Sequence, residues 1–212
     1  MTASPEQEGV IKYVLAYAPG PAPTESDGFR SLRAWRDVLH RLALVGQRPD
    51  RYDGYGYGNV SCRSEDGFVI SGTQTGGPER LGVDGYAAVT ECDVAANRIV
   101  ATGPVKPSSE ALTHGAVYAL DAGIGCVLHV HSPEIWSRGA HLPGTAADVP
   151  YGTPAMAEAV AALYRDTALA DIGLFTMRGH EDGVVAFGTT IEQAGQRLVA
   201  ALADCLATDP TS

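Results

Sequence analysis

The sequence contains no long apolar run. None of its 212 residues belongs to a stretch that approaches the roughly 20 apolar residues of a transmembrane helix. Its N-terminus also lacks a basic flank followed by an apolar signal core. We therefore expect a protein without a membrane-spanning segment or a secretory signal, located in the cytoplasm.

Cysteine is scarce and scattered along the chain. The four cysteines lie far apart and none belongs to a C-x-x-C pair: Cys62, Cys92, Cys126 and Cys205. This spacing indicates neither a disulfide framework nor a cysteine zinc cage. Cys126, which lies in an apolar run, is interpreted as a small buried hydrophobic residue.

Positive charge is also in short supply. The chain has 15 Lys and Arg against 25 Asp and Glu, which gives a formal net charge of −10. Nucleic acids and anionic membranes both need a basic surface on their protein partner. Neither is therefore expected to bind this protein.

Enough apolar sequence is present for one large domain. Apolar residues make up 45% of the chain and charged residues 19%, and we find no internal repeat. A Pro- and Gly-rich stretch at residues 18–23 separates the run 9–17, which could be a strand or an arm, from the rest. We divide the chain into an N-terminal arm, residues 1–27, and a single domain, residues 28–212.

Hydrophobic periodicity predicts an alternation of helices and strands. Helical spacing of apolar residues predicts helices over residues 28–47, 107–120, about 154–164, and 191–206. Short apolar runs predict strands over residues 68–71, 86–90, 125–131, 174–177 and 184–187. The interleaving of the two types indicates an α/β layered domain.

His129 and His131 end the predicted strand 125–131. Because side chains on a strand repeat every second residue, both imidazoles point to the same face and can share one ion. Neutral imidazole suits Zn²⁺ and other first-row divalent metals. Taken alone, such a pair is equally compatible with histidines that serve only the core or the surface.

A third ligand is needed for a catalytic metal site, which has about three protein ligands and one open position. The best candidate is His180, in a glycine-flanked turn between two predicted strands. His114 and His141 are alternatives. His114 lies one helical turn after Glu110 and is assigned a structural or supporting role, and His141 lies in a loop where we expect it to be solvated.

The start of the helix 107–120 offers an acid and two hydroxyls. Glu110 falls in the first turn, where the helix dipole keeps a carboxylate ionised, although it could equally be a capping acid. Ser108 and Ser109 combine hydroxyls with free backbone N–H groups, which together suit a phosphate. With the glycine-rich loop 71–77 and the turn 58–59, they predict an anion pocket.

The order of these motifs resembles the class II aldolase/adducin-head family. The motifs are G-N-V-S at 58–61, the loop 70–76, P-S-S-E at 107–110, H-V-H-S-P at 129–133, and His180. The family includes zinc-dependent fuculose-phosphate and rhamnulose-phosphate aldolases, ribulose-5-phosphate 4-epimerase and methylthioribulose-phosphate dehydratase. The resemblance, which runs from about Leu32 to Leu206, implies a three-layer α/β/α sandwich with a mixed, largely antiparallel central sheet. It also implies a homo-oligomer, usually a tetramer, that acts on a small-molecule substrate.

Carried over position by position, the resemblance assigns roles to the candidate residues. It makes His129, His131 and His180 the zinc ligands, and Glu110 the catalytic acid/base. The substrate phosphate would be held by six residues: Gly58, Asn59, Thr75, Gly76, Ser108 and Ser109. The implied activity is that of a zinc-dependent lyase (an aldolase), which breaks or forms a C–C bond in a sugar-phosphate-like hydroxy ketone through an enediolate.

The chain departs from the family pattern at three places. The loop 71–76 is longer than the usual T-P-S-G turn, and His180 is followed by Glu181 and Asp182 instead of glycine, which adds negative charge beside the metal. The segment between His131 and His180 is short and contains no residue that matches the catalytic tyrosine of the aldolases. Tyr151 is only a guess at its equivalent.

Other functions are compatible with parts of the pattern. A 4-epimerase or a dehydratase of the same family is possible, but epimerases typically carry Asp at the position of Glu110, which favours a lyase. A non-catalytic module like the adducin head should lack one or more of the four key residues, and this chain has all of them. A cupin is disfavoured because Glu134 is too close to His131 and no second cupin motif follows.

Overall fold

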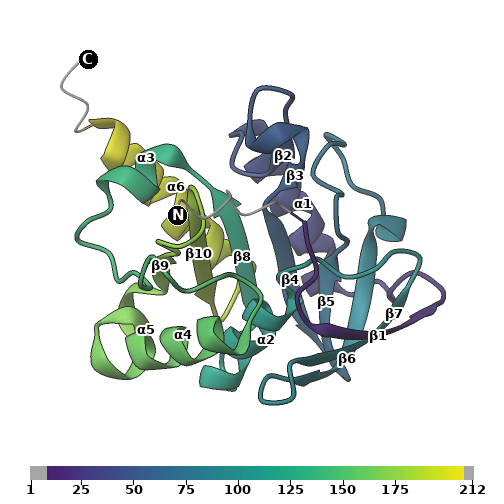
Figure 1. Cartoon of the computed structure of the whole chain (residues 1–212). Coiled ribbons are helices and arrows are strands. Elements are labelled where there is room, and N and C mark those ends of the chain that lie inside the picture. The colour runs from purple at the N-terminus through teal and green to yellow at the C-terminus, as the bar shows by residue number, and fades with distance from the viewer. Residues whose placement is uncertain (1–8, 208–212) are drawn as a thin grey trace.

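One eight-stranded sheet forms the centre of the molecule (Figure 1). The computed structural model describes residues 9–207. The strand order is β1-β7-β6-β5-β4-β8-β10-β9. The strands are β1 (Val14–Pro19), β4 (Asn59–Ser64), β5 (Gly67–Ser71), β6 (Tyr86–Asp93), β7 (Arg98–Gly103), β8 (Cys126–His131), β9 (Leu174–Thr176) and β10 (Gly183–Gly188).

The sheet is mixed and largely antiparallel, as expected. The β1–β7 pair is parallel, and every other neighbouring pair is antiparallel. A second, two-stranded sheet pairs β2 (Gly46–Gln47) with β3 (Gly56–Tyr57). Two short 3₁₀ turns, η1 (Tyr52–Gly54) and η2 (Val83–Gly85), lie in the loops.

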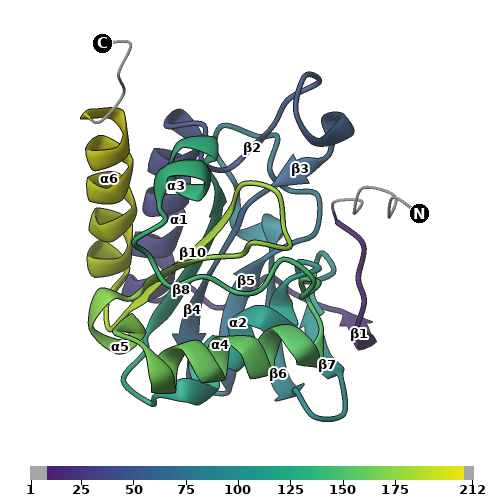
Figure 2. The same cartoon turned by 60° about the vertical axis from the view of Figure 1, so that its left-hand side comes forward.

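Helices cover both faces of the sheet, which confirms the three-layer architecture (Figure 2). One face packs against α1 (Asp27–Arg41), α3 (Pro133–Arg138) and α6 (Ile191–Ala207). The other packs against α2 (Ala111–Leu120), α4 (Pro154–Asp166) and α5 (Leu169–Ile172). Strand residues alternate between the two cores. On β8, for example, Leu128 and Val130 face the α1 side and Val127 faces the α2 side.

The predicted helices and strands occur, with differences at some ends. The helix expected over 28–47 ends at Arg41, because Leu42 leaves the helical conformation and Ala43 takes a positive φ of 57°. The helix expected from 107 begins at Ala111, so Glu110 occupies the N-cap position and not the first turn.

Several elements were not predicted. The burial of β7 alternates strictly, a period-2 signal in Arg98–Gly103 that sequence reasoning missed. A Pro/Gly loop was expected after His131, but it contains α3, whose start is signalled by Pro133 and by Ser132, which accepts a hydrogen bond from the Ile135 amide. The helix α5 was missed as well.

The N-terminal run forms a strand. β1 lies at the edge of the central sheet, in register with β7 from Val14 opposite Arg98 to Pro19 opposite Gly103. This settles the choice between strand and arm for that run. The division of the chain at residue 27 stays a prediction, and residues 1–8 and 208–212 lie outside the described residues.

Cys126 is completely buried at the start of β8, as interpreted. Within residues 9–207, no helix combines the length and the apolar character needed to cross a bilayer.

Candidate metal centre and anion pocket

His129 and His131 project from β8 toward the α2 layer. They share a face of the strand with Val127, whereas Leu128 and Val130 point to the opposite core. Both imidazoles are buried, and their Nε2 atoms lie 3.2 Å apart. The same-face geometry expected from the sequence is therefore present.

His180 reaches the same point from the turn between β9 and β10. The turn is closed by hydrogen bonds from the His180 amide to Met177 O and from the Gly183 amide to His180 O. A Cβ on Gly183 would lie 2.7 Å from Cδ2 of His180, so a glycine is needed where the strand leaves the turn. The imidazole is buried, and the possible ligand atoms of His129, His131 and His180 lie within 4.8 Å of one another.

The three imidazoles fit a transition-metal ion. Two nitrogens at ~2.0–2.1 Å from a tetrahedral zinc are about 3.3 Å apart, close to the 3.2 Å between His129 and His131. Nδ1 of His129 donates to the carbonyl of Val184 at 3.2 Å, which leaves the lone pair on Nε2, the atom that faces the other ligands.

Burial keeps two of these imidazoles neutral. It lowers the pKa of His129 to about 4, although the charge of Glu110 acts in the opposite direction. It also lowers the pKa of His131 well below 6.5, and the charges of His180 and His129 add to the effect. Neutral imidazole is the form that binds metals, so the site is ready for a cation near pH 7.

Glu110 turns its carboxylate toward the histidines and away from its own helix. Its side chain makes no capping hydrogen bond. Oε1 lies 3.2 Å from Nε2 of His129 and 3.2 Å from Nε2 of His180. Among the described residues, the buried Oε2 has no hydrogen-bond partner. The alternative that Glu110 merely caps the helix is therefore wrong.

The surroundings of Glu110 favour its ionised form. Burial acts to raise the pKa of the carboxyl. The positive charge that His129 takes up at acid pH and a hydrogen bond from His180 outweigh burial and hold the pKa at about 2. An ionised carboxylate beside these imidazoles is suited to accept a proton from a bound substrate.

The two alternative histidines lie outside the metal-ligand group, as expected. Nδ1 of His114 is 2.7 Å from Oγ of Ser61, and this hydroxyl also contacts the Tyr118 hydroxyl at 2.8 Å. His114 is buried beneath Glu110 and contributes to the polar packing of α2. His141 is exposed in the loop that follows α3.

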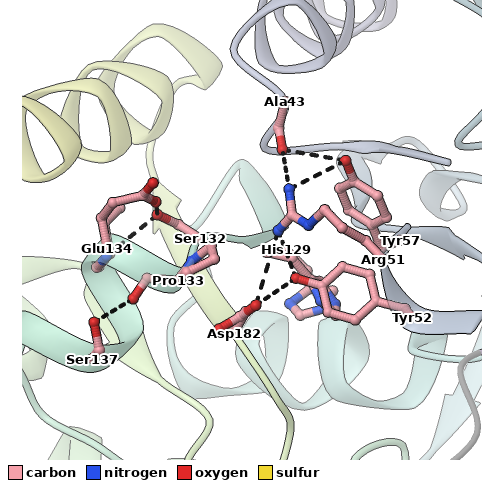
Figure 3. A network of polar contacts seen from close by, with 12 residues as sticks. Ala43, Arg51, Tyr52, Tyr57, His129, Ser132, Pro133, Glu134, Ser137 and Asp182 are labelled. Atoms are coloured by element: carbon pink, nitrogen blue, oxygen red, sulfur yellow. Dashed lines mark hydrogen bonds and ion pairs between the residues drawn. The ribbon is translucent and has the colours of Figure 1, made fainter. Parts of the chain in front are cut away.

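Sequence reasoning missed a tyrosine–arginine–aspartate network formed by Tyr52, Arg51 and Asp182 (Figure 3). It packs against His131. The Tyr52 ring lies 4.6 Å from the His131 ring, and its hydroxyl donates to Oδ2 of Asp182 at 2.6 Å. Arg51 donates to the Tyr52 hydroxyl at 2.6 Å and lies 3.9 Å from Asp182. The negative charge expected from Asp182 is thus partly offset by Arg51.

No sequence motif predicts this network, because it depends on the backbone conformation of two loops. Tyr52 and Asp182 both have positive φ values, 49° and 60°, which non-glycine residues seldom adopt. The signal in the sequence was limited to the tyrosine- and glycine-rich composition of residues 53–58.

Tyr151 lies at the site. Its ring is completely buried 4.6 Å from the His180 ring, and its hydroxyl donates to Val10 O at 3.4 Å. The residue guessed to replace the family tyrosine is therefore next to a candidate metal ligand.

The six residues predicted to hold a phosphate line one pocket, which we call the anion pocket: Gly58, Asn59, Thr75, Gly76, Ser108 and Ser109. Asn59 is in register with His129 on the neighbouring strand, and Glu110 lies between the pocket and the histidines. The buried Oδ1 of Asn59 has no hydrogen-bond partner within residues 9–207.

A buried arginine fixes the lengthened loop of the pocket. Arg36 is 1% exposed and donates hydrogen bonds to the carbonyls of Thr75, Gly76, Pro78 and Glu79 at 2.6–3.2 Å. This residue was missed, although an arginine on the apolar face of α1 was a signal that a buried acceptor cluster existed.

Gln74 narrows the anion pocket. With a φ of 56°, it turns its carboxamide onto Gly56, where Oε1 accepts from the Gly56 amide at 2.9 Å. The cavity that remains has a volume of about 20 Å³, room for roughly one water molecule.

The sequence matches a known family model, "Class II Aldolase and Adducin N-terminal domain", over residues 49–205. Methylthioribulose-1-phosphate dehydratase from Gluconobacter oxydans (strain 621H) is 37% identical over 106 residues, which are 47% of this chain and 46% of that protein. The chain thus matches about half the length of this curated relative.

Solved structures share the fold. L-fuculose-1-phosphate aldolase from Thermus thermophilus has a TM-score of 0.61 and 19% identity, covering 84% of this chain and 91% of its own. YgbL from Klebsiella pneumoniae, described as a putative aldolase/epimerase/decarboxylase, has a TM-score of 0.65 and 17% identity, covering 88% and 90%. At such identities the likeness concerns the fold alone.

Proposed function

Because the chain belongs to the family of class II aldolase and adducin N-terminal domains, we propose that it is a zinc-dependent lyase of the aldolase type. Its reaction breaks or forms a C–C bond in a small, sugar-phosphate-like hydroxy ketone through an enediolate. The observation that carries this proposal is the convergence of three buried imidazoles with the carboxylate of Glu110.

The proposed zinc ligands are His129, His131 and His180. A zinc ion bound there would supply Lewis acidity, which polarises the substrate carbonyl and makes the neighbouring C–H bond more acidic. The chain contributes a tautomer fixed by Val184 and a water-poor surrounding. Ser108, Ser109 and the rest of the anion pocket would orient the distal end of the substrate.

Glu110 is the proposed acid/base. In the direction of bond formation it takes a proton from the carbon next to the carbonyl, and the remaining electron pair attacks the carbonyl carbon of an aldehyde. The aldehyde oxygen takes up a proton to become a hydroxyl. In the direction of cleavage the hydroxyl gives up its proton to solvent and its oxygen becomes the aldehyde carbonyl. The C–C bond breaks, its electrons form the enediolate, and Glu110 returns a proton to the carbon.

A dehydratase is the second candidate, favoured by the 37% identity to methylthioribulose-1-phosphate dehydratase. The first step would be the same proton abstraction by Glu110. Hydroxide would then leave from the next carbon, so a C–O bond would break in place of a C–C bond. The enol product would tautomerise to a diketone, and the hydroxide would take up a proton to form water.

Product analysis distinguishes the two candidates. We expect the purified protein to contain zinc by elemental analysis and to release an aldehyde from a ketose 1-phosphate, with loss of activity on chelation and recovery with zinc. Conversion of methylthioribulose 1-phosphate to a diketone without aldehyde release would identify the dehydratase. Absence of bound metal and of both reactions would support a non-catalytic interaction module.

We also propose a cytoplasmic location and a homotetrameric assembly. The ground for both is the resemblance to the sugar-phosphate aldolases. Light scattering coupled to gel filtration measures the assembly directly, and a monomeric mass at micromolar concentration would contradict it.

A further inference from the structure

Residues 9–13 form one wall of the candidate site, which we call the N-terminal wall. Gly9 lines the anion pocket, and the Tyr151 hydroxyl donates to Val10 O at 3.4 Å. The Tyr13 hydroxyl donates to the carbonyl of Ser108 at 2.7 Å, and both residues are buried. Two hydrogen bonds therefore hold the wall to residues near Glu110 and His180, and Gly9 borders the anion pocket.

Lys12 lies in the middle of this wall. Its Nζ is 3.5 Å from the centroid of the Tyr151 ring, and that ring packs 4.6 Å from the ring of His180. Burial lowers the pKa of Lys12 to about 8, while the charge of Glu110 acts to raise it. The ammonium group thus lies within electrostatic reach of the catalytic carboxylate.

The anion pocket itself is lined by no lysine or arginine among the described residues. Arg36 lies behind the loop and directs its donors to four carbonyls. An oxyanion next to the ionised Glu110 is repelled unless a cation is close to both, and charge-assisted hydrogen bonds are the stronger kind. Of the two lysines, Lys12 is the one whose charge interacts with Glu110.

We propose that Lys12 is a substrate-binding residue: the N-terminal wall holds its ammonium group over the Tyr151 ring, within electrostatic range of Glu110, and there it binds an oxyanion of the substrate. The oxyanion is a phosphate or a carboxylate. This inference rests on the proposed function for the identity of the reaction, but the binding of an oxyanion is testable without turnover. If Lys12 only clamps the Tyr151 ring, removing it leaves anion binding unchanged.

The sequence contains two lysines, Lys12 and Lys106, so a lysine label reports on the candidate residue and on one internal control. Reductive methylation with ¹³C-formaldehyde retains the positive charge and labels both side chains together with the α-amino group. The spectrum of Lys12→Met identifies the Lys12 signal. Lys106, which is exposed on the approach to Pro107, serves as the internal control.

The zinc-loaded, labelled protein is titrated with inorganic phosphate and, separately, with glycolate. We expect the Lys12 signal to shift to saturation with at least one of them while the Lys106 signal stays in place. A response to phosphate assigns a phosphate ester, and a response to glycolate alone assigns a carboxylate. A Lys12 signal that moves with neither anion overturns the proposal.

Kinetics supply the second readout. With an active substrate, Lys12→Met should raise KM about ten- to a hundredfold, the effect of losing one charge-assisted hydrogen bond, and Lys12→Arg should recover part of it. Zinc content should equal that of the wild type, and Lys106→Met should leave KM unchanged. A KM within about twofold of the wild type for Lys12→Met would also overturn the proposal.

The same measurements distinguish an error in the proposed reaction from an error in the role of Lys12. A protein that turns over no ketose phosphate, yet shows the saturable shift of the Lys12 signal, has the oxyanion site but another reaction. A protein that cleaves its substrate while Lys12 is insensitive to anions has the reaction without this binding residue.

Discussion

Glu110 is a buried carboxylate with one oxygen that has no hydrogen-bond partner among the described residues. It is 2% exposed, and one of its oxygens contacts two candidate ligands while the other has no partner among the described residues. A buried, unsatisfied carboxylate oxygen costs free energy, and such costs are concentrated at functional sites. This geometry is the one expected of the proton acceptor that we propose.

The substitution Glu110→Gln tests this interpretation. The amide preserves the volume but cannot exchange a proton, so zinc content should stay at the wild-type level while kcat falls by roughly 10²–10⁴-fold. Elemental analysis and steady-state kinetics measure the two quantities. An unchanged kcat in an assay in which the wild type is active would remove Glu110 from the mechanism.

His114 gives a prediction about pH. Burial lowers its pKa to about 3, so the native protein keeps this imidazole neutral whereas the unfolded chain protonates it near pH 6.5. Because the unfolded state binds the extra proton, stability is lost as the pH falls below about 6.5, by ~1.4 kcal/mol per pH unit for one proton.

The variant His114→Asn should lose this share of the pH dependence. Between pH 6.5 and 5.0 the free energy of unfolding of the wild type should fall by about 2 kcal/mol more than that of the variant. Urea unfolding of the zinc-free proteins at both pH values gives the difference. Equal pH dependence in the two proteins would show that His114 titrates normally in the folded state.

At the scale of secondary structure, the loop that follows β5 is held in place by hydrogen bonds from α1. Arg36 occupies a position on the apolar face of the helix, between Leu32 and Leu39, and its guanidinium donates to four loop carbonyls. Removing it leaves those acceptors, of which Gly76 O makes a fully buried hydrogen bond, without their donor.

Arg36→Met should therefore lower the free energy of unfolding by about 3 kcal/mol, the cost of unsatisfied buried acceptors and lost charge-assisted hydrogen bonds. Arg30→Met on the same helix is the matched control, because Arg30 is exposed and pairs with Asp27 at the surface. Its effect should stay within about 0.5 kcal/mol. Urea denaturation measures both variants, and equal effects would contradict the anchoring role of Arg36.

The elements also show what could be predicted from the sequence. The placement of His129 and His131 followed from strand alternation, and that of His180 from a glycine-bounded turn, because both signals are local. The positions of Arg36, Tyr52 and Lys12 depend on contacts between segments far apart in the chain, or on left-handed backbone, and neither leaves a periodic pattern.

At the scale of the whole molecule, the proposed metal would join two segments of the central sheet that are far apart in the sequence. Its ligands come from β8, an interior strand, and from the β9–β10 turn. An ion that binds the folded chain alone stabilises it by mass action, by about 2.7 kcal/mol when free metal is at 100 times Kd.

Thermal unfolding should thus depend on zinc. We expect Tm to rise with added zinc and to fall with a chelator, and we expect the variant His131→Ala to show no zinc dependence. Calorimetry at several zinc concentrations measures the shift. A His131→Ala protein whose Tm responds to zinc like the wild type would place the ion elsewhere.

The edge position of β1 has a kinetic consequence. The strand has a single neighbour, β7, so its detachment breaks one ladder of hydrogen bonds and costs less than the detachment of a central strand. Amide hydrogen exchange should be faster in Val14–Pro19 than in Cys126–His131. Because residues 9–13 continue directly into β1, each such opening loosens the wall that carries Lys12 while the metal ligands stay in place.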